Sequence, residues 1–204
     1  MINAFLLMFE PMKTWERIAQ LRRSVAFVLF TYLIPLLALV SAAEGYALVN
    51  WGKWGNWGGF TYKPRHFTAG EVIFYGALQC AVVLVIVFVA AKVMQSMGTT
   101  FHTRHTFSQV FACIAYSLGP MILLRFLDLF PKLSPWVPYA VGVLFTIAVL
   151  YHGVPRMLDP DPAHAFGLYV SSILLLVLTT GVARFVTKRY LEGQLGPLHT
   201  LFTS

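Results

Sequence analysis

Long apolar stretches separated by short polar segments run through the whole chain. Five stretches contain few or no charged residues: 24–43, 72–91, 107–130, 136–151 and 165–183. An α-helix of about 20 apolar residues spans the hydrocarbon core of a bilayer. The pattern therefore predicts an all-α integral membrane protein, in which residues 24–190 form a bundle of five transmembrane helices. The fourth stretch is short for a full crossing, and residues 191–204 are expected to form a short tail.

The first 23 residues have a different pattern. Apolar side chains recur every three or four positions between charged ones: Phe5, Met8, Met12, Trp15, Ile18 and Leu21. This spacing places them on one face of a helix, which Pro11 divides. We predict that residues 1–23 form an amphipathic segment at the membrane surface, with its basic side chains toward the headgroups. A helix packed on the protein's own bundle would show the same spacing.

The third apolar stretch is interrupted near its middle by Tyr116, Ser117, Gly119 and Pro120. Proline lacks a backbone donor and crowds the preceding turn, so a helix through this point should kink. The carbonyl of Tyr116 then needs another hydrogen-bond donor, because no water is available in hydrocarbon. The hydroxyl of Ser117 or a neighbouring helix would supply one. The interruption therefore predicts that the third span lies inside the bundle, with the other spans around it.

Tryptophans occur near the predicted membrane boundaries. Trp51, Trp54 and Trp57 follow one another at every third position, each next to a glycine. An indole ring has an apolar body and one polar N–H, which suits the headgroup layer. We predict that this loop anchors the protein at the interface, together with Trp15 and Trp136. Recognition of a carbohydrate or a quinone headgroup by the same rings is the alternative.

The composition agrees with a membrane protein and leaves its orientation open. The chain is 58% hydrophobic and 11% charged, with a formal net charge of +7. We attribute the positive charge to lysines and arginines near the ends of the spans, where they meet lipid headgroups. Membrane lipids are therefore expected partners, and nucleic acid is not. The basic residues divide almost equally between the two sides, so charge alone does not orient the chain.

Several ionisable residues lie at the edges of the apolar stretches: Glu44, Lys92, Arg125, Asp128 and Arg184. Arg125 and Asp128 are three positions apart on the same predicted helix, a spacing that allows them to pair. Side chains at span ends can otherwise reach the interface by extending along the lipid. We therefore expect no proton or ion path through these residues.

Four histidines provide a weak candidate for a metal site: His102, His105, His152 and His164. They occupy two segments that five spans would place on the same side of the membrane, and Asp159 and Asp161 lie nearby. The spacing is loose, and histidine is also common at interfaces, so no metal or other cofactor is predicted. Motifs for phosphate binding, for a nucleophile elbow and for a zinc protease are missing from the sequence. We therefore predict that the protein is not an enzyme.

Three segments together resemble the bacterial members of the Yip domain family, five-span membrane proteins named for their interaction with Ypt/Rab GTPases. The segments are 9–19 (FEPMKTWERIA), 115–120 (AYSLGP) and 150–158 (LYHGVPRML), and residues 101–107 (FHTRHTF) stand where the family usually has a glycine-rich turn. The resemblance implies a cytoplasmic N-terminus and, for a bacterial member, the inner membrane. It implies no reaction. Rab binding by eukaryotic relatives uses a soluble N-terminal region, whereas about two dozen residues precede the first span here, so that function is not transferred.

These observations favour a non-catalytic membrane protein that works by binding. We predict a scaffold or accessory subunit that binds other membrane protein subunits in a larger complex, shapes the membrane, or does both. The first alternative is a channel or transporter for an ion or small lipid, which would use the kinked third span. The second is a membrane protein that depends on a metal held by the histidines.

Overall fold

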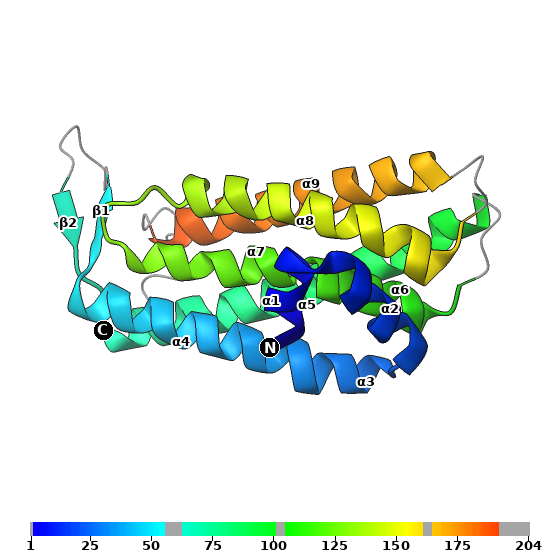
Figure 1. Cartoon of the computed structure of the whole chain (residues 1–204). Helices are drawn as coiled ribbons and strands as arrows, with labels where there is room; N and C mark the ends of the chain where they lie inside the picture. The colour runs from blue at the N-terminus through cyan, green and yellow to red at the C-terminus, as the bar shows by residue number, and fades with distance from the viewer. Residues whose placement is uncertain (1, 56–62, 101–104, 161–164, 192–204) are drawn as a thin grey trace.

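The computed structural model describes residues 2–55, 63–100, 105–160 and 165–191. Five helices in these ranges are long and apolar enough to cross a membrane, and they lie side by side in one bundle (Figure 1). The predicted all-α, five-span architecture is therefore confirmed. Two short helices precede the bundle at the N-terminus, where the sequence predicts a helical segment.

The five spans are built as follows. The first, Val25–Asn50, joins α3 (Val25–Val28), a π-helical turn (Leu29–Leu33) and α4 (Ile34–Asn50); the second is α5 (Ala69–Thr100). The third, Phe107–Leu129, joins α6 (Phe107–Ser117), α7 (Gly119–Leu124) and a 3₁₀ turn (Arg125–Leu129). The fourth is α8 (Trp136–Leu158) and the fifth is α9 (Ala165–Leu191).

Four of the spans extend beyond the apolar stretches that predicted them. The fourth is 23 residues long and continues through His152 and Pro155, so it is not short for a crossing. The first includes Glu44 and the fifth includes Arg184. Glu44 and Arg184 ended the predicted first and fifth spans early, although both side chains are buried and lie within the helices.

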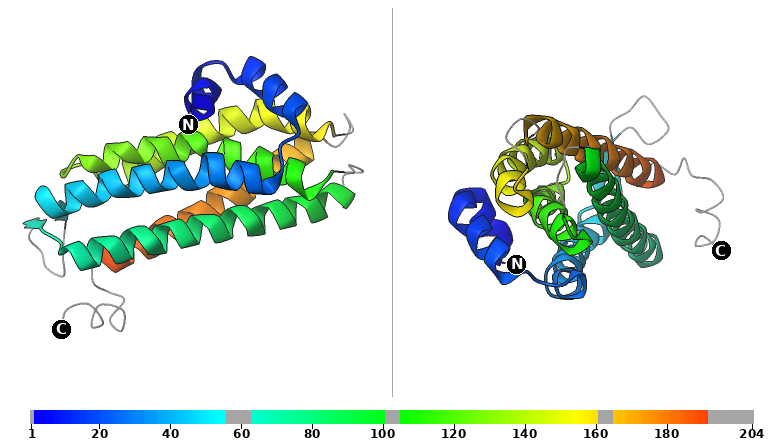
Figure 2. Two further views of the ribbon diagram at one scale, coloured as in Figure 1. Left: turned by 90° about the horizontal axis from the view of Figure 1, so that it is seen from below. Right: turned by 90° about the vertical axis from the view of Figure 1, so that its right-hand side faces the viewer.

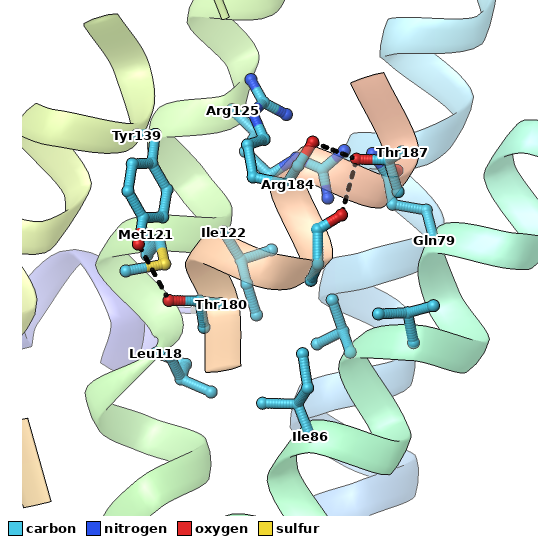
Figure 3. A pocket seen from close by; sticks show the side chains of 13 residues that line it. Gln79, Ile86, Leu118, Met121, Ile122, Arg125, Tyr139, Thr180, Arg184 and Thr187 are labelled. Carbon is cyan, nitrogen blue, oxygen red and sulfur yellow. Dashed lines mark hydrogen bonds between the residues drawn. The ribbon is translucent and has the colours of Figure 1, made fainter. Parts of the chain in front are cut away.

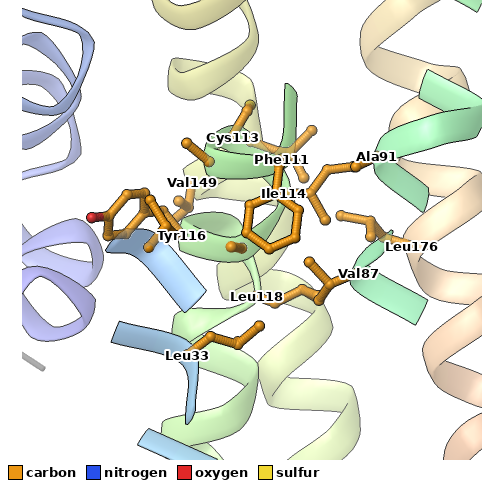
Figure 4. Packing of buried hydrophobic residues seen from close by; sticks show 14 of the residues in the cluster. Leu33, Val87, Ala91, Phe111, Cys113, Ile114, Tyr116, Leu118, Val149 and Leu176 are labelled. Carbon is orange, nitrogen blue, oxygen red and sulfur yellow. The ribbon is translucent and has the colours of Figure 1, made fainter. Parts of the chain in front are cut away.

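The third span lies at the centre of the bundle. In its most apolar stretch 78% of the residues are buried, against 17–39% in the other four spans. Phe111, Ile114 and Leu118 point toward side chains of the surrounding helices, among them Val87 of α5 and Val149 of α8 (Figure 4). The other spans therefore pack around this segment, as the sequence predicts.

The proline interruption divides the third span at Leu118, between α6 and α7. The backbone N–H of Leu118 still donates to the carbonyl of Ile114 at 3.0 Å, and Pro120 lies in the first turn of α7. The Ser117 hydroxyl is buried and makes no hydrogen bond with any described residue. It therefore does not supply the bond that we predicted for the break.

The N-terminal helices α1 (Ile2–Phe9) and α2 (Pro11–Leu21) lie against the outer side of the bundle, next to α7 and α8 (Figure 2). Pro11 starts α2, a position that proline suits because its missing N–H would have no helical partner there. A Cβ placed on Gly119 would lie 3.2 Å from the Cβ of Ala4. Since Gly119 lies in the middle of the third span, α1 packs on the bundle about halfway along its length.

A small β-ribbon closes one end of the bundle. Strands β1 (Lys53–Gly55) and β2 (Lys63–Arg65) pair antiparallel, with Lys53 opposite Arg65. Such short strands carry no recognisable alternation, and the sequence did not predict them. We call this end of the bundle the ribbon end and the opposite end, where α2 meets α3, the α2 end.

Candidate functional site

Charged side chains from three spans meet inside the bundle near the ribbon end. Glu44 of α4, Asp128 of the 3₁₀ turn and Arg184 of α9 are buried, and the side chain of Arg125 is 11% exposed. The chain directions bring them together, because α4, α7 and α9 all run toward the ribbon end. We call these four residues the charge cluster.

The charge cluster contains two ion pairs between different spans. Nη2 of Arg125 lies 2.7 Å from Oε2 of Glu44, and Nη2 of Arg184 contacts Oδ2 of Asp128. The pairing of Arg125 with Asp128 that the spacing allows is therefore not formed. A local pair would leave Glu44 and Arg184 buried without opposite charges, which is costly in a low-dielectric interior.

Helix α5 contributes neutral hydrogen-bonding groups to the same site. The hydroxyl of Tyr75 donates to Oε1 of Glu44 at 2.7 Å, and Nε2 of Gln79 donates to the Tyr75 hydroxyl at 2.9 Å. Gln79 is the one strongly polar residue of the second predicted apolar stretch. These bonds connect α5 to α4 through buried polar atoms.

Lys53 of β1 closes the cluster from the ribbon. Its Nζ donates to the backbone carbonyls of Asp128 at 3.0 Å and Phe130 at 3.3 Å. Burial lowers the pKa of Lys53, although the carboxylates of Asp128 and Glu44 act in the opposite direction. The bonds tie the ribbon to the end of the third span.

A cavity of about 60 Å³ lies next to the charge cluster, between α5, α7, α8 and α9 (Figure 3). Ile86, Leu118 and Ile122 form an apolar wall, while Arg125 and Arg184 lie at one end. The volume suits a few water-sized molecules and is far below that of pockets that enclose a drug-sized ligand. Each carboxylate of the cluster pairs with an arginine, so the arrangement holds helices together.

The expectation that the other ionisable residues extend to the interface is thus wrong for Glu44 and Arg184, which are buried inside the bundle. Lys92, by contrast, is exposed on α5. One signal in the sequence could have indicated the cluster. Opposite charges occur at similar distances from the same end of three spans, and an unpaired charge at such a depth is unfavourable.

The candidate metal ligands do not form a site in the described part of the chain. His105 immediately precedes the capping residue of α6, and His152 lies within α8. His102, His164 and Asp161 fall outside the described residues. No group of three or more potential ligands occurs among the residues that the structure describes.

The tryptophans have two kinds of environment. Trp15 is fully buried and donates its indole N–H to the carbonyl of Val149 at 2.9 Å, so it does not anchor α2 in the headgroup layer as predicted. Trp51 and Trp136 are partly exposed at the ribbon end, with 52% and 38% of their surface accessible. Trp57 and the side chain of Trp54 lie outside the described parts of the chain.

Comparison with known proteins agrees with the architecture. The chain matches the Yip1 domain over residues 5–183, from α1 into the fifth span. No curated protein and no solved structure gives a match. The matched region includes both the central third span and the N-terminal helices packed against it. The chain therefore belongs to the Yip1 domain family of multi-pass membrane proteins.

Proposed function

We propose that this protein is a non-catalytic membrane scaffold or accessory subunit that binds other membrane proteins through the outer faces of its spans. The pairing within the charge cluster carries the proposal. Intramembrane charges commonly mark ion or substrate paths. Here Glu44 pairs with Arg125 and Asp128 with Arg184, each across two spans. The pairs favour a rigid bundle over a transport path.

The outer surface of the bundle offers room for partner helices. Only 22% of the most apolar stretch of the second span and 17% of that of the fifth are buried. A groove of about 430 Å³ lies between α4 and α5, where the small residues Ala42 and Ala77 are exposed among the lining residues. Small residues allow helices to approach closely in a membrane. A second groove of about 460 Å³ lies between α5 and α9.

Photocrosslinking in the native membrane tests this proposal. A photoreactive amino acid is placed at Ile73 in the first groove, at Leu178 in the second, and at Leu144 on α8 as the control; these residues are 73%, 66% and 67% exposed. We expect a discrete adduct with one membrane protein from a groove position and lipid adducts from Leu144. Lipid adducts at every position, together with solute movement by the purified protein in liposomes, would instead support a transporter.

The orientation is also part of the proposal. We place the α2 end in the cytoplasm because Arg22 and Arg23 directly precede the first span and the family resemblance implies a cytoplasmic N-terminus. The resemblance to bacterial members is also the reason to propose a bacterial inner membrane. Cysteines introduced one at a time at Lys13, which is 82% exposed, and at Ser204 test this placement after replacement of Cys80, while the native Cys113 is kept because it is fully buried. Labelling of both cysteines from the same side would contradict five spans.

A further inference from the structure

A cavity of about 810 Å³ opens at the α2 end, between α2, the turn that follows it, α6 and α8. We call it the vestibule. Its polar lining residues come from all of these elements: Gln20, Arg22, Arg23, His105, Thr106, Ser108, Gln109, Arg156 and Asp159. It lies at the opposite end of the bundle from the charge cluster, and nothing in the proposed scaffold role requires it.

The rim of the vestibule is basic. Its described lining residues include three arginines and one carboxylate. Arg156 pairs with Glu16 at 3.8 Å, and the guanidinium of Arg23 lies 4.0 Å from the centre of the Phe27 ring. Arg22 makes no ion pair with any described residue. The rim therefore has positive charge available for an anion from outside the chain.

The vestibule also presents neutral polar groups. Ser108 and Gln109 lie in the first turn of α6, behind the capping residue Thr106. Nε2 of His105 is buried and has no hydrogen-bond partner among the described residues. A phosphate accepts hydrogen bonds from donors of these types as well as from guanidinium groups.

The floor of the vestibule is apolar. It is lined by Ile18, Ala112, Met157 and the aromatic side chain of Tyr116. Tyr116 lies nine positions after the start of α6, about 13 Å along a helix with a rise of 1.5 Å per residue. The cavity thus changes from charged to apolar along the direction in which a phospholipid changes from headgroup to acyl chain.

We propose that the vestibule binds a phosphate-bearing headgroup, and that the phosphate comes from an anionic phospholipid in the leaflet at the α2 end. The starts of α3 and α6 and the end of α8 surround the rim, so it lies at the level of the headgroups. Guanidinium groups recognise phosphate oxygens through charge-assisted hydrogen bonds. The volume is within the range of pockets that hold small ligands. The apolar floor favours a lipid over a soluble phosphate.

Native mass spectrometry of the full chain tests the proposal. Wild type and variants are reconstituted in phosphatidylcholine vesicles containing a minor fraction of phosphatidylglycerol and are extracted in mild detergent. R22Q/R23Q should reduce retained phosphatidylglycerol about thirtyfold, since two basic residues near anionic lipid are removed at about 1 kcal/mol each. The matched control is K13Q/R17Q, which removes the same charge from exposed positions of α2. This control should retain the lipid as wild type does.

A gain-of-binding variant keeps the test independent of folding defects. D159N removes the carboxylate from the rim, and asparagine suits the left-handed backbone at this position, where φ is 30°. D159N should retain several times more phosphatidylglycerol than wild type. Equal retention by R22Q/R23Q and K13Q/R17Q would overturn the proposal, as would D159N without a gain. Displacement of the lipid by inorganic phosphate at modest concentration would overturn the lipid assignment and indicate a soluble phosphate.

Discussion

The indole ring of Trp15 lies against the backbone of Gly153. A Cβ on Gly153 would be 2.6 Å from Cζ2 of Trp15, and the indole N–H donates to the carbonyl of Val149 one turn earlier. The contact fixes α2 on α8 at the α2 end. Glycine is required at this position because any side chain would occupy the space of the ring.

Gly153→Ala should therefore displace α2 and destabilise the protein by about 1–3 kcal/mol, the usual range for overpacking. Thermal unfolding in detergent measures the loss, and proteolysis after Arg17 of α2 reports the displacement. Gly70→Ala is the matched control, because a Cβ on Gly70 has no neighbour within 4 Å. Equal effects of the two substitutions would show that the Trp15 contact does not hold α2.

A second prediction concerns Gly119 and Tyr32. A Cβ on Gly119 would overlap the Tyr32 hydroxyl, which is buried and lacks a hydrogen-bond partner among the described residues. Gly119→Ala should destabilise the bundle by about 1–3 kcal/mol. Tyr32→Phe should be nearly neutral alone, because it removes an unsatisfied buried hydroxyl. The double variant should recover part of the loss, and additive effects in unfolding measurements would exclude the contact.

The ion pairs provide a third prediction. Arg184→Met leaves the side chain of Asp128, which is 2% exposed, without its arginine and should cost about 3–5 kcal/mol. Asp128→Leu combined with Arg184→Met should recover much of this loss, because no unpaired charge remains. Lys13→Met breaks an exposed pair with Glu10 and serves as the control, with an effect within about 1 kcal/mol. Denaturant titration in mixed micelles compares the variants.

The fourth prediction concerns pH. Burial lowers the pKa of His105 below its usual value of 6.5, and Asp159 opposes this change in part. In the window below 6.5 the unfolded chain binds a proton that the folded chain does not, so folding stability falls as the pH falls. His105→Asn should weaken the pH dependence of the melting temperature between about pH 7.5 and pH 5. An unchanged slope would mean that His105 does not titrate differently on folding.

The sequence predicted the number, order and approximate positions of the spans, because long apolar stretches dominate its pattern. The ends were harder to predict. Glu44 and Arg184 were placed at membrane boundaries, whereas both lie inside spans. A prediction from hydropathy ends a span at a charged residue. The hydropathy pattern contains no information on whether another span supplies the opposite charge.

The environment of Trp15 shows the same limit. A tryptophan in an amphipathic segment suits a headgroup layer and a helix interface equally well, since both offer apolar contact and one acceptor. The distinguishing residue is Gly153, far away in the sequence. Local spacing therefore predicted the apolar face of α2 correctly but not the surface that the face contacts.

The position of α1 determines when it can fold. Ala4 packs beside Gly119, so α1 cannot make this contact until the third span has been synthesised and inserted. Contact with α8 must wait for the fourth span. The α1 helix therefore docks on the bundle after spans that follow it in the sequence are in the membrane, and its docking completes their assembly.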